Sequence, residues 1–181
     1  AILGDSIARL LEVTGHDVYR EYYYNNAGRQ MRVLGESVKA RYLELYGVDS
    51  VFPEDGYQGD YIIDIARALA DDVGDSLVKT SDCAPFTRKA EEEIFKTISS
   101  TLKRMGIVFD NYYNEQSLYD DGHIDSVVNE LKEKGFVYEK DDATWFKTTA
   151  FGQEQDRVII KSTGEPTYRL PDIAYHREKF R

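Results

Sequence analysis

Apolar side chains recur at three- and four-residue intervals along much of the chain, which is the spacing of helices with one buried face. Near the N-terminus, Leu3, Ile7 and Leu10 keep this spacing, and Gly15 follows them as a C-terminal cap. In a later and longer segment, Pro85 suits the first turn of a helix. Helices are predicted for residues 2–14, 29–46, 61–72, 85–105 and 122–134, and a last helix is predicted to start near Pro171.

Strands are predicted where Val, Ile and Tyr gather between turn residues. The predicted strands are residues 17–24, 107–113, 136–139, 144–148, 157–161 and 166–168, of which the last four form two hairpins. The first 46 residues alternate helix, strand, turn and helix. This order predicts the middle of a doubly wound α/β domain that lacks its first strand. In such folds the loop after the first strand usually binds phosphate.

The size and charge of the chain limit its function. With 181 residues it can form one domain with a modest insertion. Its formal net charge is -10, whereas proteins that bind nucleic acid by themselves usually present a basic surface to the phosphates. We therefore expect weak or no RNA binding by this chain alone. No apolar run approaches the roughly 18 residues that span a bilayer, so we expect no membrane partner.

Cysteine and histidine usage argues against metal and disulfide sites. Cys83 is the only cysteine, which excludes an internal disulfide and suits a reducing cytoplasm. His16, His123 and His176 have no partner at the spacing of metal ligands. We therefore expect a cytoplasmic chain that binds no metal by itself.

A first candidate site follows the strand predicted to end at Tyr24. Asn26 and Gln30 supply amide groups, and Gly28 lets a ligand approach the backbone. Ligands of open α/β sheets bind at the carboxyl ends of the strands. However, Asn-Asn-Ala-Gly is also an ordinary turn between a strand and a helix, with Asn26 as the helix cap. The pattern alone favours this structural interpretation.

A second candidate site is Tyr168 with Asp172, four residues apart across a predicted helix start. The carboxylate could bind a planar guanidinium, and the aromatic ring could orient it. The alternative is structural, because the helix dipole stabilises an aspartate in the first turn without any ligand. His176 could also contact a ligand, although a histidine on a helix surface is the simpler interpretation. Residues 114–119 could line a pocket, but a polar loop with Ser117 or Asp120 near a helix start is the simpler interpretation.

No glycine-rich phosphate loop, dinucleotide-binding motif or nucleophile elbow occurs in the sequence. The residues by themselves therefore indicate an acidic α/β domain with a candidate cation-binding edge. They assign no catalytic residue.

Several segments resemble arginyl-tRNA synthetases, a class I family, and occur in that family's order. They are residues 4–18, 20–30, 53–59, 117–119, 156–162 and 164–176. The last contains Gly-Glu-Pro-Thr-Tyr at 164–168 and Asp-Ile-Ala-Tyr-His at 172–176. One departure is Asn26, where the family often has an aspartate. The resemblance implies a Rossmann-like class I core that lacks its first strand. The core parts would be residues 1–50 and 150–181, and residues 51–149 would be a mixed α+β inserted region.

The resemblance also implies a reaction and its substrates, which are arginine, ATP with Mg²⁺, and tRNA-Arg. The carboxylate of arginine would attack the α-phosphate of ATP, and the arginyl group would then pass to the terminal adenosine of the tRNA. Tyr168 and Asp172 match the tyrosine and aspartate that contact the arginine side chain in this family. The residues expected near the active site are Asn26, Gly28, Gln30 and His176.

Two motifs of the family that handle ATP are missing from the sequence. Its His-x-Gly-His motif would precede Ala1, and its Lys-Met-Ser-Lys-Ser-like loop would follow Arg181. We therefore expect an internal segment of a bacterial arginine–tRNA ligase that is inactive alone and binds no ATP or Mg²⁺ by itself. One alternative is a non-catalytic binding module derived from a synthetase. Another, a different nucleotide-using class I enzyme, is weakened by the motifs within residues 164–176.

Overall fold

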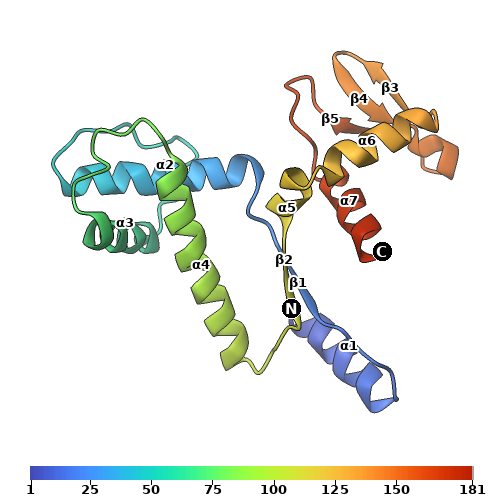
Figure 1. Ribbon diagram of the computed structural model, residues 1–181, viewed down its shortest axis with the longest axis horizontal. Coiled ribbons are helices and arrows are strands. Elements are labelled where there is room, and N and C mark those ends of the chain that lie inside the picture. Colours follow the sequence, from blue (N-terminus) through green and yellow to red (C-terminus); the bar gives the residue numbers. More distant parts are fainter. Residues whose placement is uncertain (181) are drawn as a thin grey trace. The chain divides into compact units, whose positions relative to one another are not determined.

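The computed structural model describes residues 1–180, which form two compact units. The first unit comprises residues 1–22 and 26–112, and the second comprises residues 23–25 and those from 113 onward. No helix within residues 1–180 combines the length and apolar character needed to cross a bilayer. The elements (Figure 1) are α1 (Ile2–Val13), β1 (Glu21–Tyr24), α2 (Gly28–Leu45), α3 (Asp60–Val73), α4 (Ala84–Arg104), β2 (Asn111–Asn114), α5 (Glu115–Asp120), α6 (His123–Glu133), β3 (Val137–Lys140), β4 (Ala143–Phe146), the 3₁₀ helix η1 (Thr148–Phe151), β5 (Arg157–Ile160) and α7 (Arg169–Lys179).

Helices α2, α3 and α4 pack around the hydrophobic core of the first unit (Figure 1). Tyr42, Ile62 and Phe86 are fully buried in this core. The edge of the Tyr42 ring meets the Phe86 ring at a centroid distance of 5.3 Å. The Tyr42 hydroxyl donates to the carbonyl of Gly74, which fixes the end of α3 against α2. The three predicted helices in this region are thereby confirmed, and all three begin one residue earlier than expected.

Gly35 allows α2 and α4 to approach each other closely. A Cβ atom at this position would lie 2.0 Å from the Thr87 side-chain oxygen and 3.2 Å from the Thr87 backbone nitrogen. The hydroxyl could rotate away, but the backbone could not. We expect Gly35→Ala to lower the free energy of unfolding by roughly 1–3 kcal/mol, which is the usual effect of overpacking. The higher helix propensity of alanine offsets only part of this loss. Chemical denaturation measures the change. Gly4→Ala in α1 is the matched control, because nothing lies within 4 Å of its Cβ position.

Helix α1 has the predicted bounds to within one residue, but its apolar face is uncovered within the described residues. Leu3 is 74% exposed and Leu10 is 68% exposed. The segment after the helix is held to it by charge, because the Arg20 guanidinium donates to both carboxylate oxygens of Glu12 at 2.6 and 2.8 Å.

The strands of the first half are shorter than predicted. Of residues 17–24 only the last four form β1, and it pairs with β2 in a two-stranded sheet. The regular ladder ends at Arg20, whose backbone N–H donates to the Asp110 carboxylate at 2.7 Å while its carbonyl accepts from the N–H groups of Asp110 and Asn111. No larger sheet includes β1 within residues 1–180. The mixed α/β class is confirmed, whereas the Rossmann-like arrangement is not.

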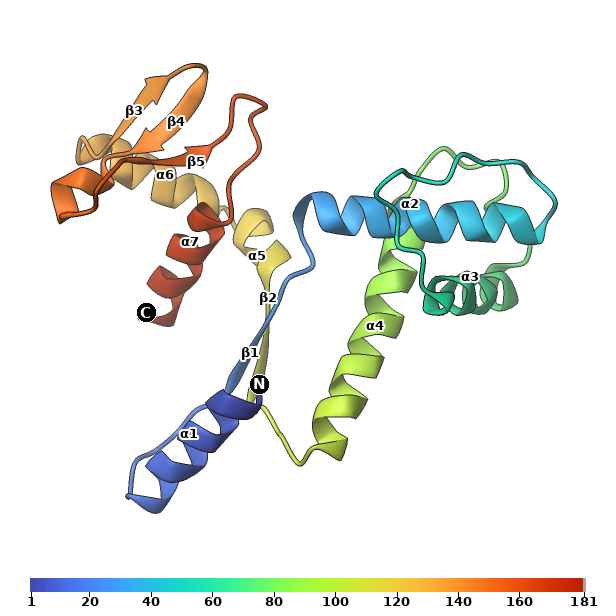
Figure 2. The ribbon, with the colours of Figure 1, turned by 180° about the vertical axis from the view of Figure 1, so that it is seen from behind.

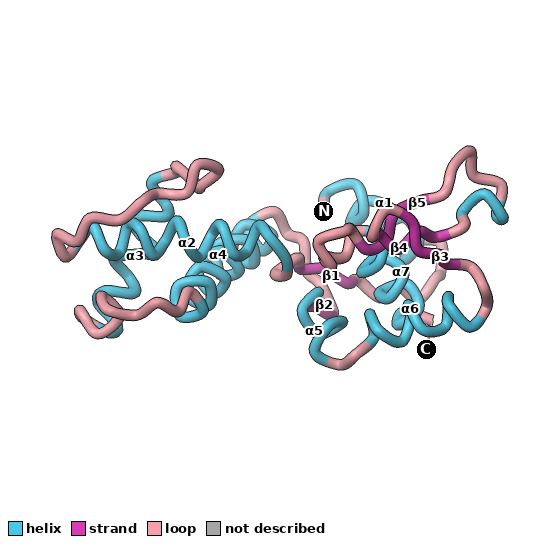
Figure 3. Tube along the Cα trace, turned by 90° about the horizontal axis from the view of Figure 1, so that it is seen from above, coloured by secondary structure: helices cyan, strands magenta, loops and turns pink. Residues whose placement is uncertain are grey.

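The second unit contains an antiparallel sheet of order β3-β4-β5, with α6 and α7 packed against it (Figures 2 and 3). The predicted first hairpin is confirmed. Its turn is tighter than expected, since Asp141 and Asp142 alone turn the chain with φ of 54° and 57°. On this hairpin the Trp145 ring stacks on the Tyr138 ring at 6.4 Å, and its indole N–H donates to the Lys140 carbonyl at 3.0 Å.

Three expectations for the second unit need correction. The second hairpin is a single bridge between Ile160 and Pro166, because proline has no N–H for a ladder. Residues 115–120 form the helix α5 rather than a loop, and the Asn114 side chain caps it by accepting from the Gln116 N–H at 2.8 Å. Helix α7 begins at Arg169, two residues before the predicted start. The family-based boundaries near residues 50 and 150 stay a prediction.

Candidate functional site

A buried carboxyl group marks the centre of the candidate site. Glu115 is the first residue of α5 and is only 8% exposed. Burial raises the pKa of Glu115, and the nearby negative charge of Asp172 raises it further. Within residues 1–180 no cationic side chain pairs with Glu115. A buried carboxylate without a counter-ion is costly, so this position favours a cationic ligand.

Three tyrosine rings form a wall beside this carboxyl. Tyr23 from β1 lies 4.5 Å from Tyr175 of α7 and 6.2 Å from Tyr113 of β2, measured between ring centroids. The Tyr23 hydroxyl is buried and has no hydrogen-bond partner of good geometry. Burial raises the pKa of Tyr23, and the charge of Glu115 raises it further. The wall therefore contains one unpaired polar group, the Tyr23 hydroxyl, near the carboxyl.

The predicted pair Tyr168 and Asp172 lies at the start of α7. The Asp172 backbone N–H donates to the Tyr168 carbonyl at 3.2 Å, so one helical turn joins the two residues. Asp172 is exposed, and its charge acts on both Glu115 and Tyr23. Tyr168 is 69% exposed, and the guanidinium of its neighbour Arg169 lies over its ring at 4.6 Å. The ring face of Tyr168 can thus accept a guanidinium.

His176 also belongs to α7 and is exposed. Its Nδ1 lies 2.7 Å from the Asp172 carbonyl oxygen. A carbonyl only accepts, so Nδ1 carries the proton in this contact. This arrangement fits the structural interpretation of His176, and a role in ligand binding stays a prediction.

The other predicted residues, Asn26, Gly28 and Gln30, belong to the first unit. Asn26 is 9% exposed, and its amide donates to the Glu91 carboxylate at 2.5 Å. The expectation that Asn26 caps the helix is wrong, because the cap of α2 is Ala27 and no side chain bonds there. Gly28 has φ of +78°, a left-handed conformation that favours glycine at the first position of α2. Gln30 is exposed.

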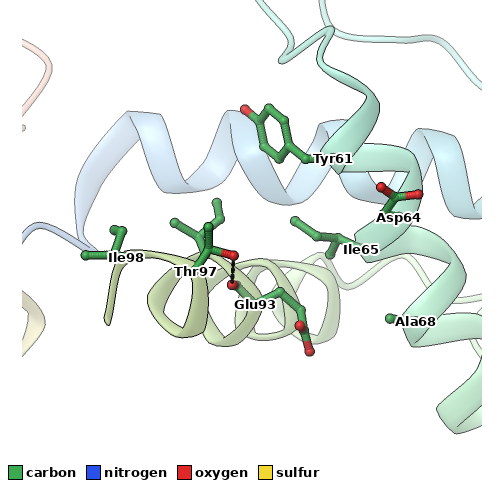
Figure 4. A pocket seen from close by; sticks show the side chains of 8 residues that line it. Tyr61, Asp64, Ile65, Ala68, Glu93, Thr97 and Ile98 are labelled. Carbon is green, nitrogen blue, oxygen red and sulfur yellow. Dashed lines mark hydrogen bonds between the residues drawn. The ribbon is translucent and has the colours of Figure 1, made fainter. Parts of the chain in front are cut away.

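A pocket of about 410 Å³ lies between α3 and α4 in the first unit (Figure 4). Its lining is mostly apolar, with Asp64 and Glu93 as the acidic members. Hydrogen bonds from Lys89 and Lys96 lower the pKa of Glu93, so this carboxylate is already paired. The pocket contains none of the site residues predicted from the sequence.

Sequence reasoning missed Glu115 and Tyr23 as site residues. Both stand in segments that the sequence did single out, namely a polar stretch before a helix and a run of three tyrosines. The burial of the Glu115 side chain and of the Tyr23 hydroxyl is what the sequence did not show. The available signal was an acidic residue directly after Asn114, a helix-capping type, between two apolar segments.

The sequence matches the family described as tRNA synthetases class I (R), catalytic domain, over residues 1–181. The chain belongs to this family. It is 75% identical to the arginine–tRNA ligase of Desulfotalea psychrophila over the whole chain, which is 33% of that protein. It is 54% identical to the arginine–tRNA ligase of Salinibacter ruber over 99% of the chain and 35% of that protein. The chain thus spans about a third of the length of the curated relatives it matches.

Solved structures show the same mixed α/β fold as this member of the synthetase family. A Campylobacter jejuni protein assigned as an arginyl-tRNA synthetase superposes with a TM-score of 0.85 at 31% identity, over 98% of this chain and 39% of that one. The arginyl-tRNA synthetase of Plasmodium falciparum superposes with a TM-score of 0.66 at 17% identity, which supports the fold alone. The family resemblance deduced from the motifs is confirmed.

Proposed function

We propose that this chain is part of an arginine–tRNA ligase and that Glu115 and Asp172 bind the guanidinium of arginine. The observation that carries the proposal is the buried carboxyl of Glu115, which has Asp172 close by and no cationic partner within residues 1–180. Family membership supports the same substrate.

The chemistry of arginine fits this pair of carboxylates. A guanidinium is planar, stays charged at all relevant pH values, and presents its N–H groups as a fork that matches carboxylate oxygens. Two carboxylates on α5 and α7 could each accept part of the fork. The Tyr168 ring would cover one face of the guanidinium, as it does for Arg169. A lysine ammonium has the charge but not the fork.

The proposed reaction has two steps. The carboxylate of arginine attacks the α-phosphate of ATP, which forms arginyl-adenylate and releases pyrophosphate. A hydroxyl of the terminal adenosine of tRNA-Arg then attacks the arginyl carbonyl, and AMP leaves. Mg²⁺ would accompany ATP, although residues 1–180 contain no group of three or more His, Cys, Asp or Glu side chains that could hold a metal ion. No step is assigned to a metal held by this segment.

We also propose that the segment divides into parts of a catalytic core and an insertion. Residues 1–50 and 150–181 would be parts of a Rossmann-like class I core, and residues 51–149 would be inserted between them. Asn26, Gly28, Gln30 and His176 would lie near the active site of the complete enzyme, in the cytoplasm.

Amino-acid selection tests the proposal. A full-length protein that carries this segment should charge tRNA-Arg with arginine. It should not charge this tRNA with citrulline, which has nearly the shape of arginine but no positive charge. It should also not charge it with lysine, which lacks the planar set of N–H donors of a guanidinium. Charging is measured as the radiolabelled amino acid that precipitates together with the tRNA. Charging with a different amino acid, or none with arginine, would overturn the proposal.

The segment alone is a second test. We expect no charging by residues 1–181 and weak or undetectable arginine binding, because the sequence contains neither ATP-binding motif of the family. Clear turnover would show that the phosphate-handling groups lie within these residues. No observation in the described residues favours the alternative of a non-catalytic module.

A further inference from the structure

The Tyr23 hydroxyl is the unexplained polar group of the candidate site. Its oxygen is buried and lacks a hydrogen-bond partner, and no other buried side-chain nitrogen or oxygen in the described residues does so. A buried hydroxyl without a partner forfeits its hydrogen bonds to water, so such a group usually has a role. The ring itself packs against Tyr113 and Tyr175.

The Glu115 carboxyl lies near this buried hydroxyl, because its charge raises the pKa of Tyr23. Glu115 and Tyr23 lie close enough to change each other's pKa, although their contact does not meet the geometry of a hydrogen bond. The other titratable groups that act on this pair are Asp172 from α7 and Tyr119 from α5 itself. Asp172 as a carboxylate cannot donate, and Tyr119 makes no hydrogen bond to Glu115, so Tyr23 is the donor placed to serve the Glu115 carboxylate.

We propose that Tyr23 is a positioning residue for arginine, whose hydroxyl donates to the Glu115 carboxylate and holds it against the bound guanidinium. This inference rests on the proposed function of the site. Each carboxylate oxygen has room for more than one donor, so Glu115 can accept from Tyr23 and from the guanidinium together. A small rotation of the carboxylate on ligand binding would turn the present contact into a hydrogen bond.

A donor at this position also governs the charge of Glu115. The guanidinium needs the carboxylate form, and burial raises the pKa of Glu115, which favours the neutral acid. A hydrogen bond from Tyr23, once formed on ligand binding, would lower that pKa. Without the hydroxyl the pKa of Glu115 rises further, so more of the site is protonated at low pH. As the solution is acidified, the KM for arginine of a variant without the hydroxyl should therefore begin to rise at a higher pH than the KM of the wild-type protein.

Tyr23→Phe in a full-length protein that carries this segment tests the proposal, because it removes the hydroxyl and keeps the packed ring. We expect the KM for arginine to rise about 3- to 10-fold near neutral pH, as loss of one hydrogen bond implies. The rise should be larger at pH 6 than at pH 8.5, while kcat changes little. Tyr22→Phe is the matched control. Tyr22 directly precedes Tyr23 in β1, but its ring packs against Phe109 and Tyr112 instead. Its KM should be unchanged.

The outcomes separate this inference from the function it rests on. If Tyr23 is only part of the core, Tyr23→Phe will keep the wild-type KM at every pH and the same or higher melting temperature, and the proposal fails. If the wild-type protein does not charge tRNA-Arg with arginine, the proposed function fails first. A KM that rises equally at pH 6 and pH 8.5 would also overturn the role assigned to the hydroxyl.

Discussion

Asp172→Asn, in a full-length protein that carries this segment, should raise the KM for arginine roughly 10- to 100-fold. The range corresponds to a charge-assisted hydrogen bond of about 1.5–3 kcal/mol, at 1.4 kcal/mol for each factor of ten. In the proposed site the guanidinium is remote from the reacting carboxylate of arginine and would keep its contacts throughout the reaction. Loss of such uniform binding raises KM and leaves kcat nearly unchanged. Steady-state charging kinetics with varied arginine measure both constants, and the KM for ATP should not move.

Asp125→Asn supplies the control for the helix dipole. Asp125 lies in the first turn of α6, as Asp172 lies in the first turn of α7. Both substitutions remove a negative charge from a helix start, which contributes about 0.3–1 kcal/mol to stability. If Asp172 serves its helix alone, the two variants will show the same small loss of stability and an unchanged arginine KM. That result would remove Asp172 from the site.

Phe86→Ala should lower the free energy of unfolding of the first unit by about 3–5 kcal/mol, the usual effect of emptying a large buried aromatic position. Phe86 is fully buried, and its ring meets Tyr42 at 5.3 Å. The loss would remove contacts that hold α2 and α4 together. Urea denaturation followed by far-UV circular dichroism measures the change.

Phe180→Ala is the comparison for Phe86→Ala. Phe180 is 88% exposed at the end of α7, so its removal should change stability by no more than about 0.5 kcal/mol. A loss below about 1 kcal/mol for Phe86→Ala would contradict the description of a single core around α2, α3 and α4.

The helices could be predicted from the sequence because each presents a periodic apolar stripe to its own unit. The bounds of α2 and α3 agree with the prediction to within one residue. The exception, α5, has six residues, which is too short for periodicity to reveal, and it depends on the cap supplied by Asn114. The strand ending at Tyr24 was overestimated because a side chain, Asp110, takes the backbone N–H of Arg20.

The candidate site was predictable only in part, and the difference is one of burial. Tyr168 and Asp172 stand in a motif that the sequence shows directly. The Glu115 side chain and the Tyr23 hydroxyl become buried only when α5, α7 and β1 pack around them. No local pattern distinguishes a buried glutamate from one on the surface, so the structure was needed to identify this pair.

Trp145 on the hairpin of the second unit is the only tryptophan of the chain. Its stacking on Tyr138 and the hydrogen bond of its indole make its fluorescence sensitive to the integrity of that hairpin. Indole emission therefore reports on the unit that contains Glu115 and is silent about the helical core of the first unit. Unfolding of the two units would appear as separate transitions if emission and ellipticity were recorded side by side.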